Sequence, residues 1–389
     1  MVSLEQAVSR IDTDPSQGGT EPANRRALPM LSELAQSVEE STAKEVPMSK
    51  RVLVTGAGGP AAVAFMNALI DSEVELHAAD IDPYAPGLYL VPAQNRHLIK
   101  RGSDRLFINH LLALCTEHKI DALVPTVDAE LLPIAQARHL FAARGVRVLA
   151  AAAETLGLCL DKWALYHACL SEVEVPRTQL LTDRSSWPGP FPCVVKPRTG
   201  SGSRGVMVVE DARSFDSIPR SDKLLVQEHL PGEEYSVDVY VGQSGGVHAA
   251  VPRVRLKVDS GVAITSRTLR DPDLIGRACQ VAKLIGLRGV ANVQFRRDRL
   301  GVARLLEVNP RFAGTMSLTV RSGANIPQMA LSELFGSPPP AGMVPFEEIG
   351  MVRTFRETYV SPQEILSLVA QAKSPSRDPA LGISYMDLC

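Results

Sequence analysis

Several features that would place this chain of 389 residues in a particular class are missing from it. The six cysteines form no Cys-x-x-Cys pair, which favours scattered reduced thiols over a disulfide framework or a cysteine zinc site. No apolar run reaches the roughly 18 residues that span a bilayer, and no basic segment followed by an apolar one opens the sequence. The net charge of −2 offers no field for a nucleic acid or a membrane surface. We therefore expect a cytoplasmic protein without nucleic-acid or membrane partners.

The composition changes near residue 48. Residues 1–47 contain no Phe, Trp or Tyr and are interrupted by glycines and prolines, so we predict a disordered tail. A start codon assigned too far upstream would explain the same pattern. From residue 51 strand and helix patterns alternate, which predicts a parallel α/β domain over 48–150. The expected strands lie at 51–55, 75–80 and 122–126, and the expected helices at about 61–72 and 106–118.

After Pro190 the pattern changes to short strands and hairpins, and this change predicts a second domain over 151–340. A small segment with one helix at 362–373 follows over 341–389. The fold class is therefore α/β in the first domain and α+β in the second. Strands are expected at 193–196, 205–209, 224–228, 235–241, 291–296 and 303–309, and helices at 161–171 and 271–285.

The most informative stretch is Leu-Leu-Glu-Val-Asn-Pro-Arg at residues 305–311. Side chains alternate between the two faces of a strand, so Glu307, Asn309 and Arg311 should share one face. Leu306 and Val308 should then point into the core. Because oxygen ligands suit Mg²⁺, the polar face predicts a metal site, and Mg²⁺ usually accompanies phosphate.

Two glycine loops follow strands. The first, Gly-Ala-Gly-Gly at 56–59, is close to a dinucleotide fingerprint, with Ala61 in the third glycine position. Asp80 could contact a ribose, although a tight turn without a ligand is the favoured alternative. The second loop, at 200–205, follows Lys196 and could close over phosphate, while Arg198 and Arg204 add positive charge. An ordinary exposed hairpin is an equal alternative for this second loop.

The strand at 225–230 leads into a polar turn that could hold the adenosine part of a nucleotide. Glu228 could accept from the adenine amine and Glu234 from the ribose hydroxyls, whereas His229 is interpreted as incidental. Further on, Arg253 and Arg255 could bind a substrate carboxylate in a bidentate manner. Plain strand ends and solvated strand faces are the alternatives in both places.

Taken together, these elements resemble the ATP-grasp superfamily over about residues 50–335. The nearest group comprises single-chain enzymes similar to one half of the carbamoyl-phosphate synthase large subunit, many of which are carboxylate–amine ligases. The resemblance implies a pre-ATP-grasp α/β domain followed by a two-lobed ATP-grasp domain. The matching elements are, in order, Lys162, Lys196 with its loop, the Gln-Glu-His-Leu segment at 227–230, Glu234, Asn-Val-Gln-Phe at 292–295 and Glu-Val-Asn-Pro-Arg at 307–311.

The resemblance also implies roles for these positions. Mg²⁺, or Mn²⁺ in its place, would bind Gln294, Glu307 and Asn309, although many relatives carry an acid where Gln294 stands. Arg311, Lys196 and Arg255 would act in catalysis, with Arg311 stabilising the transferred phosphoryl group. The residues implied to bind ATP are Lys162, Lys196, Gly200, Ser201, Gly202, Gln227, Glu228, Leu230 and Glu234.

The activity implied is an ADP-forming ligase that joins a small-molecule carboxylate to an amine through an acyl phosphate. Phosphoryl transfer needs positioning and charge neutralisation, which fits a sequence with no evident Ser–His or Cys–His nucleophile. The sequence itself is silent on oligomeric state, but dimers are common among similar enzymes, so the resemblance makes a homodimer possible. The alternatives are a carbamoyl-phosphate-synthase-like enzyme, an ATP-binding sensor without turnover, and an NAD-dependent oxidoreductase that uses the first glycine loop.

Overall fold

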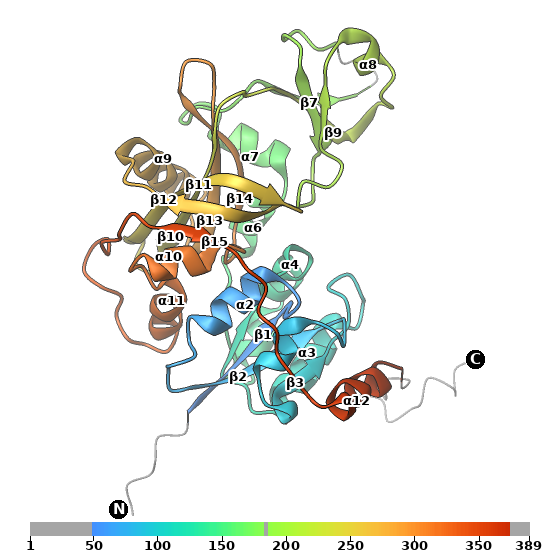
Figure 1. Cartoon of the computed structure of the whole chain (residues 1–389), viewed down its shortest axis with the longest axis vertical. Helices are drawn as coiled ribbons and strands as arrows, with labels where there is room; N and C mark the ends of the chain where they lie inside the picture. Colours follow the sequence, from blue (N-terminus) through green and yellow to red (C-terminus); the bar gives the residue numbers. More distant parts are fainter. Residues whose placement is uncertain (1–48, 183–185, 374–389) are drawn as a thin grey trace, which may run out of the picture. The chain divides into compact units, whose positions relative to one another are not determined.

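The computed structural model describes residues 49–182 and 186–373 (Figure 1). The predicted tail at 1–47 lies outside the described residues, as does the end of the predicted C-terminal segment. The described residues belong to one compact unit. Among the described residues, no helix combines the length and the apolar character that a membrane crossing requires.

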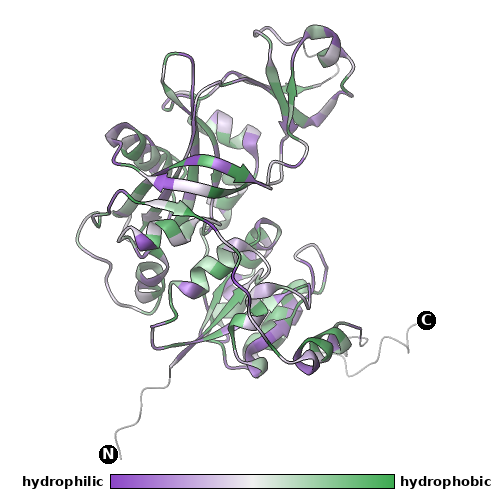
Figure 2. Ribbon diagram, in the orientation of Figure 1, coloured by the Kyte–Doolittle hydropathy of each residue, from purple (hydrophilic) through white to green (hydrophobic). Residues whose placement is uncertain are grey.

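The first domain is built on a five-stranded parallel sheet in the order β3-β2-β1-β4-β5. Its strands are β1 (Lys50–Thr55), β2 (Val74–Asp80), β3 (Arg96–Leu98), β4 (Ala122–Val124) and β5 (Arg147–Val148). Its helices are α2 (Pro60–Asn67), α3 (Phe107–Glu117), α4 (Asp128–Gln136) and α5 (Arg138–Ala142), with 3₁₀ turns η2 (Pro86–Leu90) and η3 (Ala93–Asn95). This arrangement confirms the predicted parallel α/β domain. Figure 2 shows apolar residues concentrated along these strands and on α2.

Two helices lead to a small antiparallel sheet in the order β6-β9-β7-β8. The helices are α6 (Ala153–Cys159) and α7 (Lys162–Cys169). The strands are β6 (Thr178–Leu181), β7 (Cys193–Pro197), β8 (Met207–Val209) and β9 (Ser221–Glu228), with α8 (Ala212–Asp216) after β8. This sheet has its own apolar cluster around Val195, Phe215 and Val226, so it forms a separate lobe.

The second lobe is a six-stranded sheet in the order β14-β13-β10-β11-β12-β15, and every pair in it is antiparallel. The strands are β10 (Glu234–Val241), β11 (Val247–Asp259), β12 (Val262–Thr268), β13 (Gly289–Arg297), β14 (Ala303–Asn309) and β15 (Gly350–Val352). The helices are α9 (Pro272–Leu284), α10 (Met316–Arg321) and α11 (Ile326–Leu334), while α12 (Pro362–Lys373) lies beside β3 of the first domain (Figure 1). Together the two antiparallel sheets confirm the two-lobed α+β domain.

The second lobe and the first domain share an apolar core. Phe65 of α2 packs on Phe312, with ring centroids 4.8 Å apart. After α11 the chain adds β15 to the six-stranded sheet beside β12, and it then reaches the first domain, where Glu364 of α12 accepts a hydrogen bond from Arg96 at 2.8 Å. The carboxyl ends of β1 and β2 therefore lie beside the six-stranded sheet of the second lobe. The predicted domain boundaries themselves stay a prediction.

Candidate functional site

Two cavities meet at the β13–β14 edge of the six-stranded sheet. The first has a volume of about 220 Å³ and is lined by both predicted lysines, Lys162 and Lys196. The second has a volume of about 480 Å³ and is lined by the first glycine loop and by residues of β11 to β14. A ligand in one cavity can touch a ligand in the other only where the linings coincide. Five residues line both: Ser201, Ser203, Glu234, Gln294 and Glu307.

The predicted metal ligands lie at this junction because of strand register. Gln294 of β13 is directly opposite Glu307 of β14, and Asn292 is opposite Asn309. Asn309 Nδ2 donates to Glu307 Oε1 at 3.2 Å, and Gln294 Nε2 donates to Asn292 Oδ1 at 3.2 Å. One carboxylate and two amide oxygens thus share a half-buried strand face, a hard-oxygen donor set that fits Mg²⁺.

The prediction that Leu306 points into the core was wrong. The β13–β14 register shifts at a bulge: Phe295 pairs with Leu305 and Gln294 with Glu307, so Leu306 has no partner of its own. Leu305 is buried in its place, and Leu306 lines the first cavity. Simple alternation along a strand cannot reveal this, because one extra residue exchanges the faces. Leu306 is an apolar lining residue that the sequence analysis missed.

The two lysines bring positive charge to the junction. Lys196 is buried and donates to Gln227 Oε1 at 2.8 Å, while Lys162 Nζ donates to the carbonyl of Gly200 at 2.7 Å and lies 3.5 Å from Glu307 Oε2. Burial lowers the pKa of Lys196 to about 8, against the opposing effect of Glu307. An anion that enters the cavity would therefore stabilise the charged form of Lys196.

The start of α7 fixes the position of Lys162. Asp161 caps the helix by accepting from the backbone N–H groups of Trp163 and Ala164 at 2.9 and 3.3 Å. The same carboxylate pairs with Arg198 through contacts of 2.5 to 2.9 Å. The prediction that Arg198 adds positive charge for phosphate was wrong, since Asp161 neutralises it and Arg198 lines neither cavity. Arg204 does line the first cavity, as expected.

The second glycine loop covers the junction from the side of the small sheet. Gly200 and Ser201 line the first cavity, and Ser201 and Gly202 line the second. A β-carbon placed on Gly261, in the turn between β11 and β12, would lie only 2.9 Å from Gly202 Cα. The loop therefore packs against this turn, above the shared residues.

The end of β9 forms the far wall of the first cavity. Gln227 is held on both sides, accepting from Lys196 and donating to Thr178 Oγ1 at 2.8 Å. Glu228 Oε2 accepts from the Arg177 backbone N–H at 3.2 Å, and the lining continues with buried Leu230. His229 also lines this cavity, and its interpretation as incidental stays a prediction.

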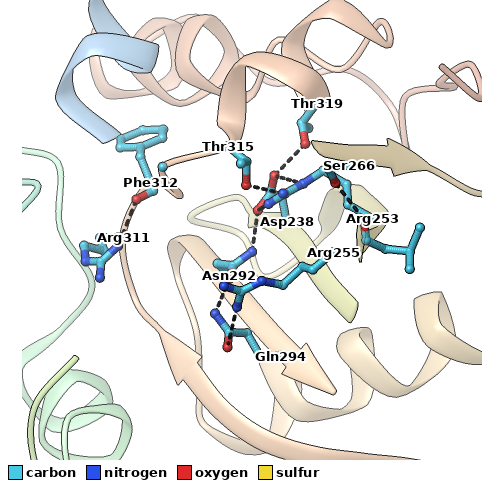
Figure 3. A network of polar contacts seen from close by, with 12 residues as sticks. Asp238, Arg253, Arg255, Ser266, Asn292, Gln294, Arg311, Phe312, Thr315 and Thr319 are labelled. Atoms are coloured by element: carbon cyan, nitrogen blue, oxygen red, sulfur yellow. Dashed lines mark hydrogen bonds and ion pairs between the residues drawn. The ribbon is translucent and has the colours of Figure 1, made fainter. Parts of the chain in front are cut away.

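Arg253 and Arg255 have separate environments. Arg253 is fully buried and pairs with Asp238 through contacts of 2.7 and 3.0 Å (Figure 3), so the prediction that it binds a substrate carboxylate was wrong. Arg255 lines the second cavity, where it donates to Glu234 at 2.6 Å and to the carbonyl of Gly261 at 2.9 Å. The predicted ribose acceptor Glu234 is therefore engaged by Arg255 in this structure.

The buried Asp238–Arg253 pair is linked by hydrogen bonds to the candidate metal ligand Gln294 (Figure 3). Asp238 also accepts from Thr319 at 2.5 Å and from Asn292 Nδ2 at 2.7 Å. Asn292 in turn accepts from Gln294, whose carbonyl oxygen lies 3.4 Å from Arg255. This chain of hydrogen bonds fixes the orientation of the Gln294 amide, which sequence could not show.

Arg311 reaches the junction from the end of β14. It forms a bidentate pair with Asp128 of α4, with Nε–Oδ1 and Nη2–Oδ2 distances of 2.5 and 3.1 Å. Burial opposes ionisation of Asp128, but Arg311 outweighs it and lowers the pKa of the carboxyl. The first domain thus holds Arg311 beside the second cavity.

Comparison with protein families supports both halves of this description. Residues 52–149 match the family model described as "PylC-like, N-terminal domain", and residues 220–357 match the model described as "ATP-grasp in the biosynthetic pathway with Ter operon". The chain carries an ATP-grasp domain. The ATP-grasp resemblance proposed from the sequence is thereby confirmed.

The individual relatives match over short stretches or at low identity. A D-alanine–D-alanine ligase of Thermotoga petrophila is 31% identical over 107 residues, which cover 26% of this chain and 35% of that ligase. The chain thus spans about a third of the length of the first curated relatives it matches.

Solved structures show the same fold over most of the chain. An L-amino acid ligase from Bacillus licheniformis aligns with a TM-score of 0.58 and 15% identity, covering 76% of each chain. The biotin carboxylase domain of 2-oxoglutarate carboxylase from Hydrogenobacter thermophilus, solved with MgADP, aligns with a TM-score of 0.61 and 17% identity, covering 76% of this chain and 72% of that one.

Proposed function

We propose that the protein is an ATP- and Mg²⁺-dependent ligase that joins a small-molecule carboxylate to an amine and releases ADP and phosphate. The observation that carries this proposal is the meeting of two cavities at Glu234, Gln294 and Glu307. An acyl-phosphate reaction needs a nucleotide on one side and a carboxylate on the other, with the γ-phosphate between them. The shared lining provides that geometry.

On the nucleotide side, the first cavity has an apolar wall and a cationic end. Val194, Val208, Leu230 and Leu306 offer surface for a purine, and the segment 227–230 runs along the cavity. Lys162 and Lys196 lie at the end nearest Glu307, where phosphates would follow. Gly200, Ser201 and Gly202 would close over them.

At the junction, Gln294, Glu307 and Asn309 would hold Mg²⁺, which neutralises phosphate charge when bound. The side chains of this protein then have three tasks. Lys196 and Lys162 stabilise charge on the phosphoryl oxygens, Arg311 stabilises the acyl phosphate, and the Gly202 loop over the Gly261 turn excludes water. Mn²⁺ is proposed as a substitute for Mg²⁺.

On the acceptor side, Arg255 is the proposed contact for the substrate carboxylate. It would exchange its present partner Glu234 for the substrate when the ribose takes up Glu234. The first glycine loop lines this second cavity, which argues against a separate NAD site. Its Gly58 N–H is already used by Asp80 Oδ2 at 2.7 Å. A homodimer and a cytoplasmic location stay predictions.

The decisive experiment follows ADP and phosphate release while the protein is incubated with ATP, Mg²⁺ and a library of amino acids and small carboxylates. Amine-dependent ADP release supports the ligase, whereas AMP and pyrophosphate would exclude an acyl phosphate. ADP formed with bicarbonate and ammonia alone would favour the carbamoyl-phosphate alternative. Binding of ATP without turnover would favour the sensor.

A single substitution then tests the metal face. Glu307→Gln removes the only carboxylate of the proposed ligand set, so turnover should fall by about 10³-fold or more while the melting temperature is unchanged. Glu233→Gln is the matched control, because Glu233 is exposed, lines neither cavity and should tolerate the change. Equal activity of Glu307→Gln and the control would place the metal elsewhere.

A further inference from the structure

Three histidines that are far apart in the sequence meet in the first domain, outside both cavities. His77 lies on β2, His97 on the neighbouring strand β3, and His118 directly follows α3. One ring nitrogen from each lies within 4.8 Å of the others, and His77 Nδ1 is 2.9 Å from His97 Nε2. The rings of His97 and His118 have centroids 4.3 Å apart. Among the described residues this is the one cluster of three or more metal-binding side chains of the His, Cys, Asp or Glu types.

The cluster has a feature common in metal sites: a carboxylate, Glu75, lies beside the ring nitrogen of His77 that faces away from the other two histidines. His77 and His97 are 3% and 7% exposed, and His118 is half-buried on the open side. His77 Nε2 is buried without a hydrogen-bond partner, and Glu75 Oε1 lies 3.4 Å from it. A carboxylate in this position favours the tautomer with a proton on Nε2, which leaves the Nδ1 lone pair facing His97 Nε2.

Glu75 is itself held in place. Arg51 Nε donates to its Oε2 at 3.0 Å, and Asn95 Nδ2 lies 3.3 Å from its Oε1. Arg51 and Asn95 thus hold Glu75 in place, and Glu75 in turn orients His77.

We propose that His77, His97 and His118 bind one divalent transition-metal ion, with Zn²⁺ as the best fit. Imidazole nitrogens suit Zn²⁺, Co²⁺, Ni²⁺ and Cu²⁺, whereas Mg²⁺ prefers oxygen. Zn–N bonds of about 2.0–2.1 Å in a tetrahedral site place nitrogens about 3.3 Å apart. The pair at 2.9 Å must therefore open by a few tenths of an ångström, and His118 must move inward. The ion would tie β2, β3 and the end of α3 together, with water as a fourth ligand.

The test uses the full chain without a polyhistidine tag, stripped with a chelator and titrated with Co²⁺ and Zn²⁺. We expect one Co²⁺ per chain with the intense visible bands of a tetrahedral nitrogen site, displaced by Zn²⁺, and a melting temperature that rises with Zn²⁺. Absence of stoichiometric binding at micromolar metal would overturn the proposal.

Variants separate this cluster from other metal sites. His118→Gln, a change at the open side, should abolish the cobalt bands while the circular dichroism spectrum is kept. Glu75→Gln should weaken Zn²⁺ binding about 10–100-fold. His139→Gln, which removes an exposed histidine outside the cluster, should bind as the unaltered chain does.

Glu307→Gln distinguishes this cluster from the proposed Mg²⁺ face, and it should bind Co²⁺ with unchanged bands. Loss of the bands in Glu307→Gln or in His139→Gln, or their retention in His118→Gln, would show that the metal binds elsewhere.

Discussion

The two glycine loops each contain a glycine with the same backbone conformation, but the surroundings of the two glycines differ. Gly56, in the first loop, has φ of +71°, and a β-carbon there would lie 2.3 Å from Val127 Cγ2. Gly202, in the second loop, has nearly the same φ, +70°, yet a β-carbon would meet nothing within 4 Å. One glycine is required by packing as well as by the backbone, and the other by the backbone alone.

The hydrogen bonds that hold the two loops also differ. The first loop is held by its own domain, since Gly58 N–H donates to Asp80. The second is held by Lys162, through the Gly200 carbonyl, and Lys162 is also the proposed phosphate ligand. A ligand that recruits Lys162 would change the support of the second loop but not of the first. Glycine spacing therefore predicts a turn, and only the surroundings distinguish a packed turn from a loop that responds to a ligand.

The largest expected difference between the loops comes from Gly56→Ala and Gly202→Ala. Both place alanine at positive φ, which costs about 1–2 kcal/mol. At Gly56 the overpacking against Val127 adds about 1–3 kcal/mol. Urea denaturation should therefore show a loss of about 2–5 kcal/mol for Gly56→Ala and about 1–2 kcal/mol for Gly202→Ala. Equal losses would show that the first loop has room for a β-carbon.

The next difference is a pH effect on stability beneath the first loop. Thr55, which precedes Gly56, donates a short hydrogen bond to buried Glu130, and burial raises the pKa of that carboxyl to about 7. Because the folded pKa is above the unfolded value near 4.5, the folded state binds the proton more tightly. Stability should therefore fall by about 3 kcal/mol as pH rises from about 4.5 through 7.

Glu130→Gln should remove this term, because its amide stays neutral and can still accept from Thr55. Its free energy of unfolding should exceed that of the unaltered chain at pH 8 and equal it near pH 4. Chemical denaturation at several pH values measures both. A constant offset between the two proteins across this range would contradict the assigned cause.

The smallest effect is expected at the second loop, where pH should change ATP binding. The pKa of Lys196 is about 8, so the free protein loses this positive charge above pH 8, and the KM for ATP should rise about tenfold per pH unit there. The depressed lysine pKa makes its stability contribution improve between pH 8 and 10.5, so unfolding through this group cannot cause the rise. Lys196→Arg stays protonated and should flatten the profile. A profile unchanged by that substitution would assign the effect to another group.

Much of the fold was readable because it rests on local patterns. Alternating strands and helices predicted the first domain, and the helix at 362–373 was predicted with the bounds of α12. Short elements such as β5 and α10 were missed, because their few residues carry no periodicity of their own. The bulge at Leu306 was missed because it depends on the partner strand.

The sequence by itself placed Gln294 and Glu307 on two strands with clear patterns. Strand alternation marked Glu307 as a candidate ligand, and the family resemblance added Gln294. Only the tertiary structure decided which arginines face a cavity. Arg198 and Arg253 pair with Asp161 and Asp238 and line neither cavity, while Arg255 pairs with Glu234 in the lining of the second cavity. It alone also brought the three histidines together from three elements. Local pattern follows from backbone geometry, which neighbours in sequence control, whereas pairing of charges and clustering of rings depend on distances between segments that only the folded chain sets.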